Sequence, residues 1–180
     1  MKRIVDAYIR DWRELAAGEL RYYKSQGSLD GVIATMCEQR NGKRHSHQRR
    51  IPSSSIEEAR RRLSSTDLER ARSFDELHAA IEKAIGDIHK IGDLAVYDIA
   101  HRLGAVLDLE PDLVYLHCGS LKGARALGLR GKALGMWELP PEFSELAPYE
   151  AEDVLCLYAN ELVGAARGES RCFARASGGC

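Results

Sequence analysis

The sequence predicts an all-α fold, a single compact helical domain of about seven helices over residues 1–165. Three observations support this. Apolar residues recur at helical spacing through most of the chain, Ser or Thr precedes a glutamate by three positions at several helix starts, and no segment shows sustained strand alternation. With 180 residues, 44 % of them apolar and 29 % charged, the chain can bury one core and has a globular composition.

The composition also excludes several classes of protein. No apolar run approaches the roughly 20 residues of a membrane span, so we expect no membrane partner and a cytoplasmic location. The five cysteines include no Cys-x-x-Cys pair for zinc, and nothing in the sequence implies a cofactor. Residues 166–180, rich in glycine, serine and alanine, are predicted to form a flexible tail.

The N-terminal part of the chain is predicted to hold two helices. Apolar spacing with charged residues between predicts an amphipathic helix over 4–23. Ser28 can then cap a short helix over 29–39 by accepting a backbone N–H bond. From residue 40 to 55 the apolar period is lost, and Asn41-Gly42 is typical of a turn, so this stretch is predicted to be a loop.

The middle of the chain is predicted to hold the most regular helices. Ser55, Thr66 and Ser73 each stand three positions before a glutamate, a capping-box pattern that marks a helix start. The third opens an apolar stripe over 74–92, and helical spacing resumes over 94–107. We therefore expect two helices joined by a very tight turn, a unit over 74–107 at the centre of the domain.

The C-terminal part is predicted to contain shorter elements. Pro111 suits the first position of a helix over 111–117, and Ser120 can cap a second helix over 121–127. Apolar spacing predicts a last helix over 148–163.

The charge distribution singles out one basic segment in a nearly neutral chain. The formal net charge is −1, yet residues 40–72 hold ten basic and four acidic side chains, a net charge of +6. Such a local excess indicates either a contact for phosphate or a mobile solvated loop. The side chains that would contact nucleic acid are those of the loop over 40–55, namely Lys43, Arg44, His45, His47, Gln48, Arg49 and Arg50. Because no cysteine or carboxylate lies near the two histidines, we expect no metal site.

The turn Ile88-His-Lys-Ile-Gly-Asp-Leu-Ala-Val96 resembles a helix-hairpin-helix motif, as found in the DNA-glycosylase-like superfamily. The resemblance implies that backbone N–H groups at the start of the second helix point toward a DNA phosphate, with Lys90 and Gly92 at the contact. Lys90 stands where the family usually has the first glycine of the hairpin, and Asp93 places a negative charge where a phosphate would dock. The alternative is a helical corner that uses Gly92 as its hinge.

A second resemblance concerns Asp112, which follows Gly92 by twenty positions. Helix-hairpin-helix DNA glycosylases carry a catalytic aspartate at a similar distance, which would stabilise positive charge on the sugar or activate a nucleophile. Leu94 occupies the place of the lysine in the lyase branch, so Schiff-base chemistry is not implied. The alternative is that Asp112 is an acidic residue opening a helix.

Polar residues inside apolar segments indicate a second candidate site. Asp98 and Arg102 are four positions apart on one helix face, with His101 beside them, and His117 lies in an apolar stretch further on. If these side chains face inward they must form a network, because unpartnered buried polar groups are costly. Such a network predicts a pocket in which Asp98 and His117 form an acid–base pair. The alternative is a surface ion pair between Asp98 and Arg102.

Three functions follow from these patterns, and whether the chain is an enzyme stays open. The segments that begin at Gly42, Gly92 and Val114 together resemble a bacterial family of small helical proteins, which implies no activity. We expect a nucleic-acid-binding protein, for DNA more than RNA, in which the hairpin and the basic loop contact the phosphate backbone. The alternatives are a small enzyme related to base-excising glycosylases and a helical adaptor whose protein partner contacts residues 137–141.

Overall fold

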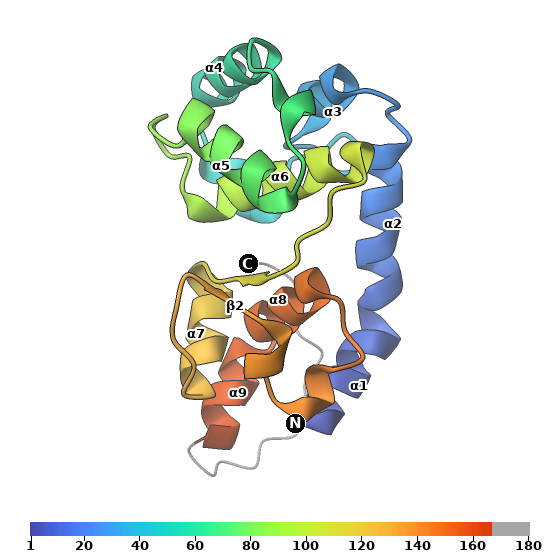
Figure 1. Cartoon of the computed structure of the whole chain (residues 1–180), viewed down its shortest axis with the longest axis vertical. Coiled ribbons are helices and arrows are strands. Elements are labelled where there is room, and N and C mark those ends of the chain that lie inside the picture. The colour runs from blue at the N-terminus through green and yellow to red at the C-terminus, as the bar shows by residue number, and fades with distance from the viewer. Residues whose placement is uncertain (167–180) are drawn as a thin grey trace. The chain divides into compact units, whose positions relative to one another are not determined.

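The computed structural model describes residues 1–166 and confirms the all-α class (Figure 1). Those residues form nine α-helices, four short 3₁₀ helices and one two-stranded sheet. They divide into two compact units. The central unit is Leu15–Pro111, and the terminal unit combines Met1–Glu14 with the chain from Asp112 onward. The single domain expected over 1–165 stays a prediction. The tail expected over 166–180 lies outside the described residues except for Ala166.

The central unit contains five α-helices, four of which pack against one another around an apolar core. Its elements are the greater part of α2 (Arg13–Lys24), then α3 (Leu29–Thr35), η1 (Ser46–Arg50), α4 (Ser53–Ser64), η2 (Leu68–Arg70), α5 (Phe74–Ile85) and α6 (Asp93–Leu107). Helix α5 packs against α4 and α6, and α3 also packs against α4 and α6. The apolar face of α5 is fully buried through Leu77, Ile81 and Ile85, as its helical spacing predicts.

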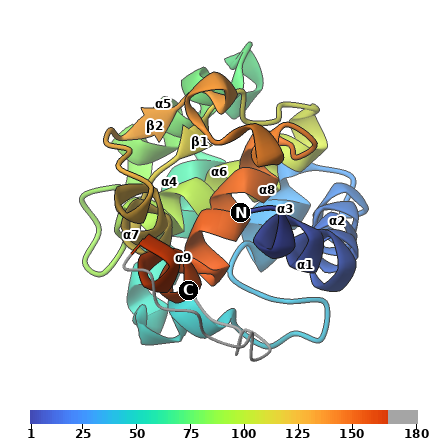
Figure 2. The same ribbon diagram turned by 90° about the horizontal axis from the view of Figure 1, so that it is seen from below.

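The terminal unit packs α1 (Lys2–Asp11), α7 (Cys118–Ala126), α8 (Pro148–Leu157) and α9 (Ala159–Ala166), with η3 (Met136–Glu138) and η4 (Pro141–Phe143) between α7 and α8. Figure 2 shows α8 between α1 and α7. Gly123 permits the close approach of α7, because a Cβ at this position would come within 2.1 Å of the Leu155 carbonyl oxygen. Strands β1 (Val114–Tyr115) and β2 (Ala133–Leu134) pair antiparallel beside them.

The number of helices exceeds the expected seven because two predicted helices are broken. The helix predicted over 4–23 is interrupted at Trp12, whose φ of −126° leaves the helical range, and the helix over 148–163 is interrupted at Tyr158, whose φ is −105°. Apolar spacing continues across both breaks, so periodicity could not reveal them.

Two further predictions are corrected. The first helix of the 74–107 unit ends at Ile85, and a seven-residue connection, Gly86 to Gly92, replaces the very tight turn. The apolar spacing predicted a helix as far as residue 92 because Ile88 and Ile91 are also buried, although they belong to this connection. The helix predicted over 111–117 is wrong, because Val114 pairs with Leu134 and this segment contains strand β1 instead.

Candidate nucleic-acid interface

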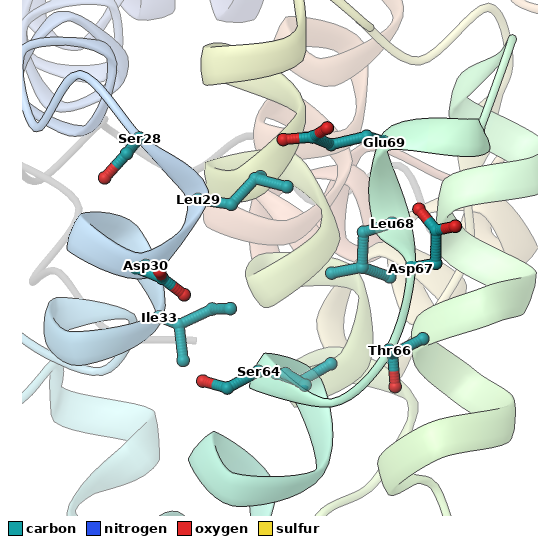
Figure 3. Close-up of a pocket in the computed structure, with 10 residues that line it drawn as sticks. Ser28, Leu29, Asp30, Ile33, Ser64, Thr66, Asp67, Leu68 and Glu69 are labelled. Carbon is teal, nitrogen blue, oxygen red and sulfur yellow. The ribbon is translucent and has the colours of Figure 1, made fainter.

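The central unit contains a cavity of about 220 Å³ between α3, the end of α4 and η2 (Figure 3). Its lining includes the apolar side chains of Leu29, Ile33 and Leu68 and the carboxylates of Asp30, Asp67 and Glu69. Carboxylates repel phosphate, so this cavity is not a candidate for binding a polyanion.

The basic loop is folded back on itself. Residues Glu38 and Arg44 form an isolated antiparallel bridge, and the His45 amide donates to the Cys37 carbonyl at 3.1 Å. Gly42 closes the turn with φ +71°, a conformation that glycine adopts without cost. The predicted loop is therefore a short ordered hairpin followed by η1.

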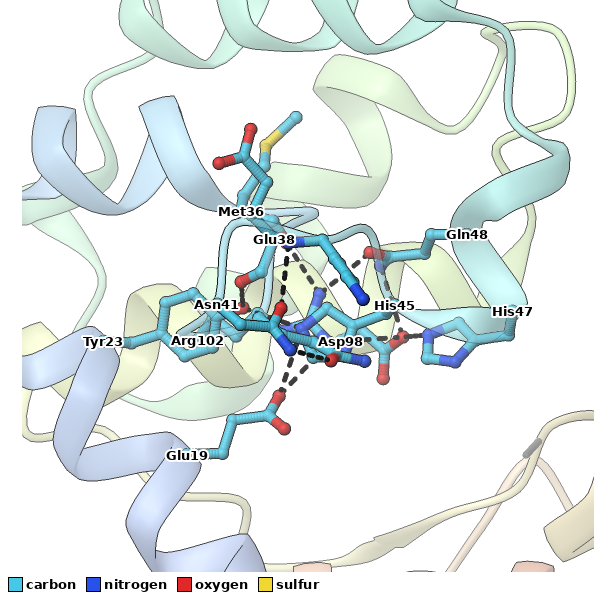
Figure 4. Close-up of polar contacts among 12 residues, drawn as sticks. Glu19, Tyr23, Met36, Glu38, Asn41, His45, His47, Gln48, Asp98 and Arg102 are labelled. Atoms are coloured by element: carbon cyan, nitrogen blue, oxygen red, sulfur yellow. Dashed lines mark hydrogen bonds and ion pairs between the residues drawn. The ribbon is translucent and has the colours of Figure 1, made fainter. Parts of the chain in front are cut away.

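Arg102 holds this hairpin from beneath (Figure 4). Its guanidinium reaches from α6 and donates to the Met36 carbonyl at 2.6 Å, to Gln48 Oε1 at 3.2 Å and to Glu19 Oε1 at 3.4 Å. It also lies 5.3 Å from the centre of the Tyr23 ring. Since Arg102 is only 4 % exposed, these contacts replace the water that its charge would otherwise hold.

The predicted residues Asp98, His47 and Gln48 meet at one carboxylate. His47 Nε2 forms a hydrogen bond with Asp98 Oδ2, and Gln48 Nε2 donates to the same oxygen at 3.4 Å. Arg102 stands 4.0 Å from that oxygen. Asp98 thus anchors η1 to α6.

His45 is buried at the base of the hairpin. Its Nε2 shares a hydrogen bond of 2.9 Å with the Tyr23 hydroxyl and lies 3.5 Å from Glu19 Oε1. Burial, together with a smaller contribution from the Arg102 charge, lowers the pKa of His45 to about 3. Partial burial raises the pKa of Glu19, against the opposing charge of Arg102. His45 is therefore neutral at physiological pH and stabilises the hairpin as a packed polar group.

The remaining cations of the loop divide into bonded and unbonded ones. Arg44 donates to the Ile51 carbonyl at 3.0 Å and to Ser53 Oγ at 2.8 Å. Lys43, Arg49 and Arg50 are exposed, and within residues 1–166 their side chains form no hydrogen bond or ion pair. In α4 the three arginines, Arg60, Arg61 and Arg62, pair with nearby glutamates. Within the basic segment over 40–72, the loop therefore holds most of the exposed cations that no carboxylate of the described residues neutralises.

The connection from Gly86 to Gly92 contains the turn that resembles a helix-hairpin-helix motif, and its backbone is left-handed at one position. Lys90, at the usual place of the first glycine, has φ +66°, the left-handed conformation that glycine favours. Gly92 is the N-cap residue of α6, and no side chain caps this helix start. Lys90, Gly92 and Asp93 are all exposed.

Helix α6 links the two regions that could bind an anion, the connection before α6 and the basic loop. Asp98, which anchors η1, lies five residues after Asp93, about 7.5 Å along the helix axis. Arg49 and Arg50 end η1 directly after the anchored residues His47 and Gln48. Helix α6 thus supports both the connection from Gly86 to Gly92, at its own start, and the exposed cations of the basic loop.

The other predicted catalytic residues belong to the terminal unit, whereas Asp98 belongs to the central unit. Asp112 is exposed. His117 is 5 % exposed, with its Nε2 lying 3.6 Å from Glu152 Oε1. Within residues 1–166 no cluster of three or more potential ligands could hold a metal ion.

Sequence reasoning missed three residues of these networks. Glu19 and Tyr23 occupy ordinary positions of an amphipathic helix, and Glu152 lies in the predicted last helix. No spacing signal distinguishes them, because each acts on a residue far away in the sequence.

No helix in residues 1–166 has the length and apolar character needed to span a bilayer. Comparison with protein-family models, curated proteins and solved structures finds no match to this chain.

Proposed function

We propose that the chain binds nucleic acid, DNA more than RNA, through the phosphate backbone. The observation that carries the proposal is the set of exposed cations Lys43, Arg49 and Arg50, which no carboxylate of the described residues neutralises. Exposed arginine and lysine bind phosphate by releasing its condensed counterions. The hydrogen bonds of Arg102, Asp98 and Gln48 beneath the loop keep these cations in place.

The start of α6 supports the same proposal. Backbone N–H groups of the first helical turn have no intrahelical acceptor, and together with the helix dipole they favour an anion. Lys90 adds a cation to the exposed connection. Its left-handed backbone at the position of the family's glycine supports the resemblance to a phosphate-binding hairpin.

The proposal is tested by titrating a short labelled DNA duplex with the full chain from low to physiological salt. We expect tight binding at low salt that weakens steeply as salt rises. The double substitution Arg49→Ala/Arg50→Ala should lower affinity about tenfold and reduce the slope of log K against log salt by about 1.8, two released counterions. An RNA duplex of the same sequence should bind more weakly.

The matched control is Arg70→Ala/Arg72→Ala, which removes the same charge from a segment next to the acid-lined cavity. This variant should bind the duplex nearly as the parent does. Equal losses in the two double variants would mean that only the total charge matters. Absence of binding at low salt, or binding that salt does not change, would refute the proposal.

A further inference from the structure

Trp137 is the more exposed of the two large apolar side chains that lie on the surface of residues 1–166, at 82 %. Its ring rests on the backbone at Gly135, where a Cβ would come within 2.3 Å of the indole carbon Cζ2. The Gly135 amide donates to Glu138 Oε1 at 2.8 Å and so closes the η3 turn that carries the indole. An exposed aromatic ring is thus held in one place, with most of its surface open.

The neighbours of Trp137 do not form an apolar patch. Leu139 is buried, Met136, Pro140 and Glu142 are partly buried, and Glu138 is exposed. Protein interfaces of useful affinity need a contiguous apolar centre, which a single ring with charged neighbours does not supply. A flat ring standing alone suits a flat partner.

Two cations precede this ring in the sequence. Arg130 and Lys132 are exposed and form no ion pair within residues 1–166. Lys132 stands three positions before Gly135, so their backbones are at most about 11 Å apart. A partner that combines flat aromatic groups with negative charges is complementary to the ring and these two cations, whereas Glu138 beside the ring repels a phosphate at its own position.

We propose that Trp137 is a stacking platform for an unpaired base of single-stranded nucleic acid, with Arg130 and Lys132 contacting the adjacent phosphates. Base stacking on an aromatic side chain tolerates any sequence, because every base presents a π face. This inference rests on the proposed function and adds to it a second binding mode, located in the terminal unit. Duplex DNA, whose bases are already stacked, should not use this platform.

The experiment uses the full chain carrying Trp12→Phe, so that Trp137 is its one tryptophan. Titration with a short oligothymidylate should quench the indole fluorescence. An abasic oligomer with the same number of phosphates should leave the fluorescence unchanged. In an anisotropy assay, Trp137→Ala should lower affinity for the oligothymidylate about tenfold, Trp137→Phe should retain most of it, and duplex affinity should stay as in the parent.

The matched control is Leu15→Ala, which removes the other exposed large apolar side chain and should leave single-strand affinity unchanged. Quenching that is equal with the abasic oligomer, or single-strand affinity indifferent to Trp137→Ala, would overturn this inference alone if duplex binding still depends on Arg49 and Arg50. A chain that binds neither duplex nor single strand would overturn the proposed function, and this inference with it.

Discussion

The arginines beneath the basic loop and on its surface carry the same guanidinium group but differ in burial and in their bonding partners. Arg102 reaches the loop from α6, is 4 % exposed and donates to Met36, Gln48 and Glu19. Arg49 and Arg50 end η1, are exposed and form no ion pair within residues 1–166. A buried guanidinium must find acceptors for its fork of donors, whereas an exposed one keeps its water until a partner displaces it.

The difference teaches how a small protein can combine order with available charge. A loop made only of exposed cations would repel itself and stay mobile. Here one buried cation is neutralised by Glu19 and Asp98 and fixes the backbone, and the exposed cations are carried on that fixed backbone. Substitution of one class should therefore change stability, and substitution of the other should change binding.

The largest expected effect breaks the buried side of this comparison. Arg102→Met keeps the volume but leaves Glu19 and Asp98 without their cation, so we expect the free energy of unfolding to fall by about 3–5 kcal/mol. Urea denaturation followed by circular dichroism measures the loss. Arg62→Met is the control, because Arg62 pairs with Glu58 near the surface and its removal should cost much less. Equal denaturation midpoints for the two variants would contradict the assigned role of Arg102.

The second effect is a pH dependence that arises at His45. The pKa of His45 is about 3 in the folded chain and about 6.5 in an unfolded one. Above pH 6.5 the side chain is neutral in both states, and between 6.5 and 3 only the unfolded chain takes up the proton. Stability should therefore fall with decreasing pH in that window, by up to about 1.4 kcal/mol per pH unit from this residue.

Glu19 acts in the opposite direction, because its raised pKa makes the folded chain the better proton acceptor above its ordinary range. The measurement is consequently a difference between variants, from denaturation curves at a series of pH values. His45→Gln should show a shallower acid loss than the parent, and substitution of the exposed His89 by Gln should leave the parent's slope unchanged. Parallel curves for parent and His45→Gln would show that His45 does not contribute.

The helices could be predicted from the sequence better than their ends. Ser28 and Ser73 cap helices as expected, by accepting from the amides of Gly31 and Glu76. Thr66, in contrast, precedes only the short η2, and Ser55 lies inside α4. Capping patterns indicate a local preference, and packing decides whether a helix follows and where it begins.

The sequence predicted which residues belong to candidate sites, but not which of them contact one another. His47 and Gln48 were predicted to contact nucleic acid, whereas Asp98 was predicted to belong to a separate polar pocket. The structure brings them together across about 50 positions. Which polar side chains of a loop turn inward depends on the helix beneath it, and that helix is remote in sequence.

A third prediction sharpens the comparison on the exposed side. Lys90→Gly removes one cation and also relieves a left-handed backbone that costs a lysine about 1 kcal/mol. We expect the free energy of unfolding to rise by about 1 kcal/mol and duplex affinity to fall a few-fold, a separation of stability from binding. Lys90→Ala is the control, since it loses the cation and keeps the strained backbone. A variant Lys90→Gly that is less stable than the parent would show that the strain is compensated elsewhere.

The smallest expected effect concerns the one carboxylate at the start of α6. Asp93 is exposed in the first turn and stabilises the helix dipole, but it repels a phosphate approaching the same amides. Asp93→Asn should therefore tighten duplex binding a few-fold at low salt, with the gain vanishing as salt rises, while the helix loses at most about 1 kcal/mol. Asp75→Asn makes the same change in the first turn of α5 and should leave duplex binding almost unaltered. If both variants gain equally, the benefit comes from net charge. A gain confined to Asp93→Asn would locate the phosphate at the start of α6, the helix that Asp98 and Arg102 join to the basic loop.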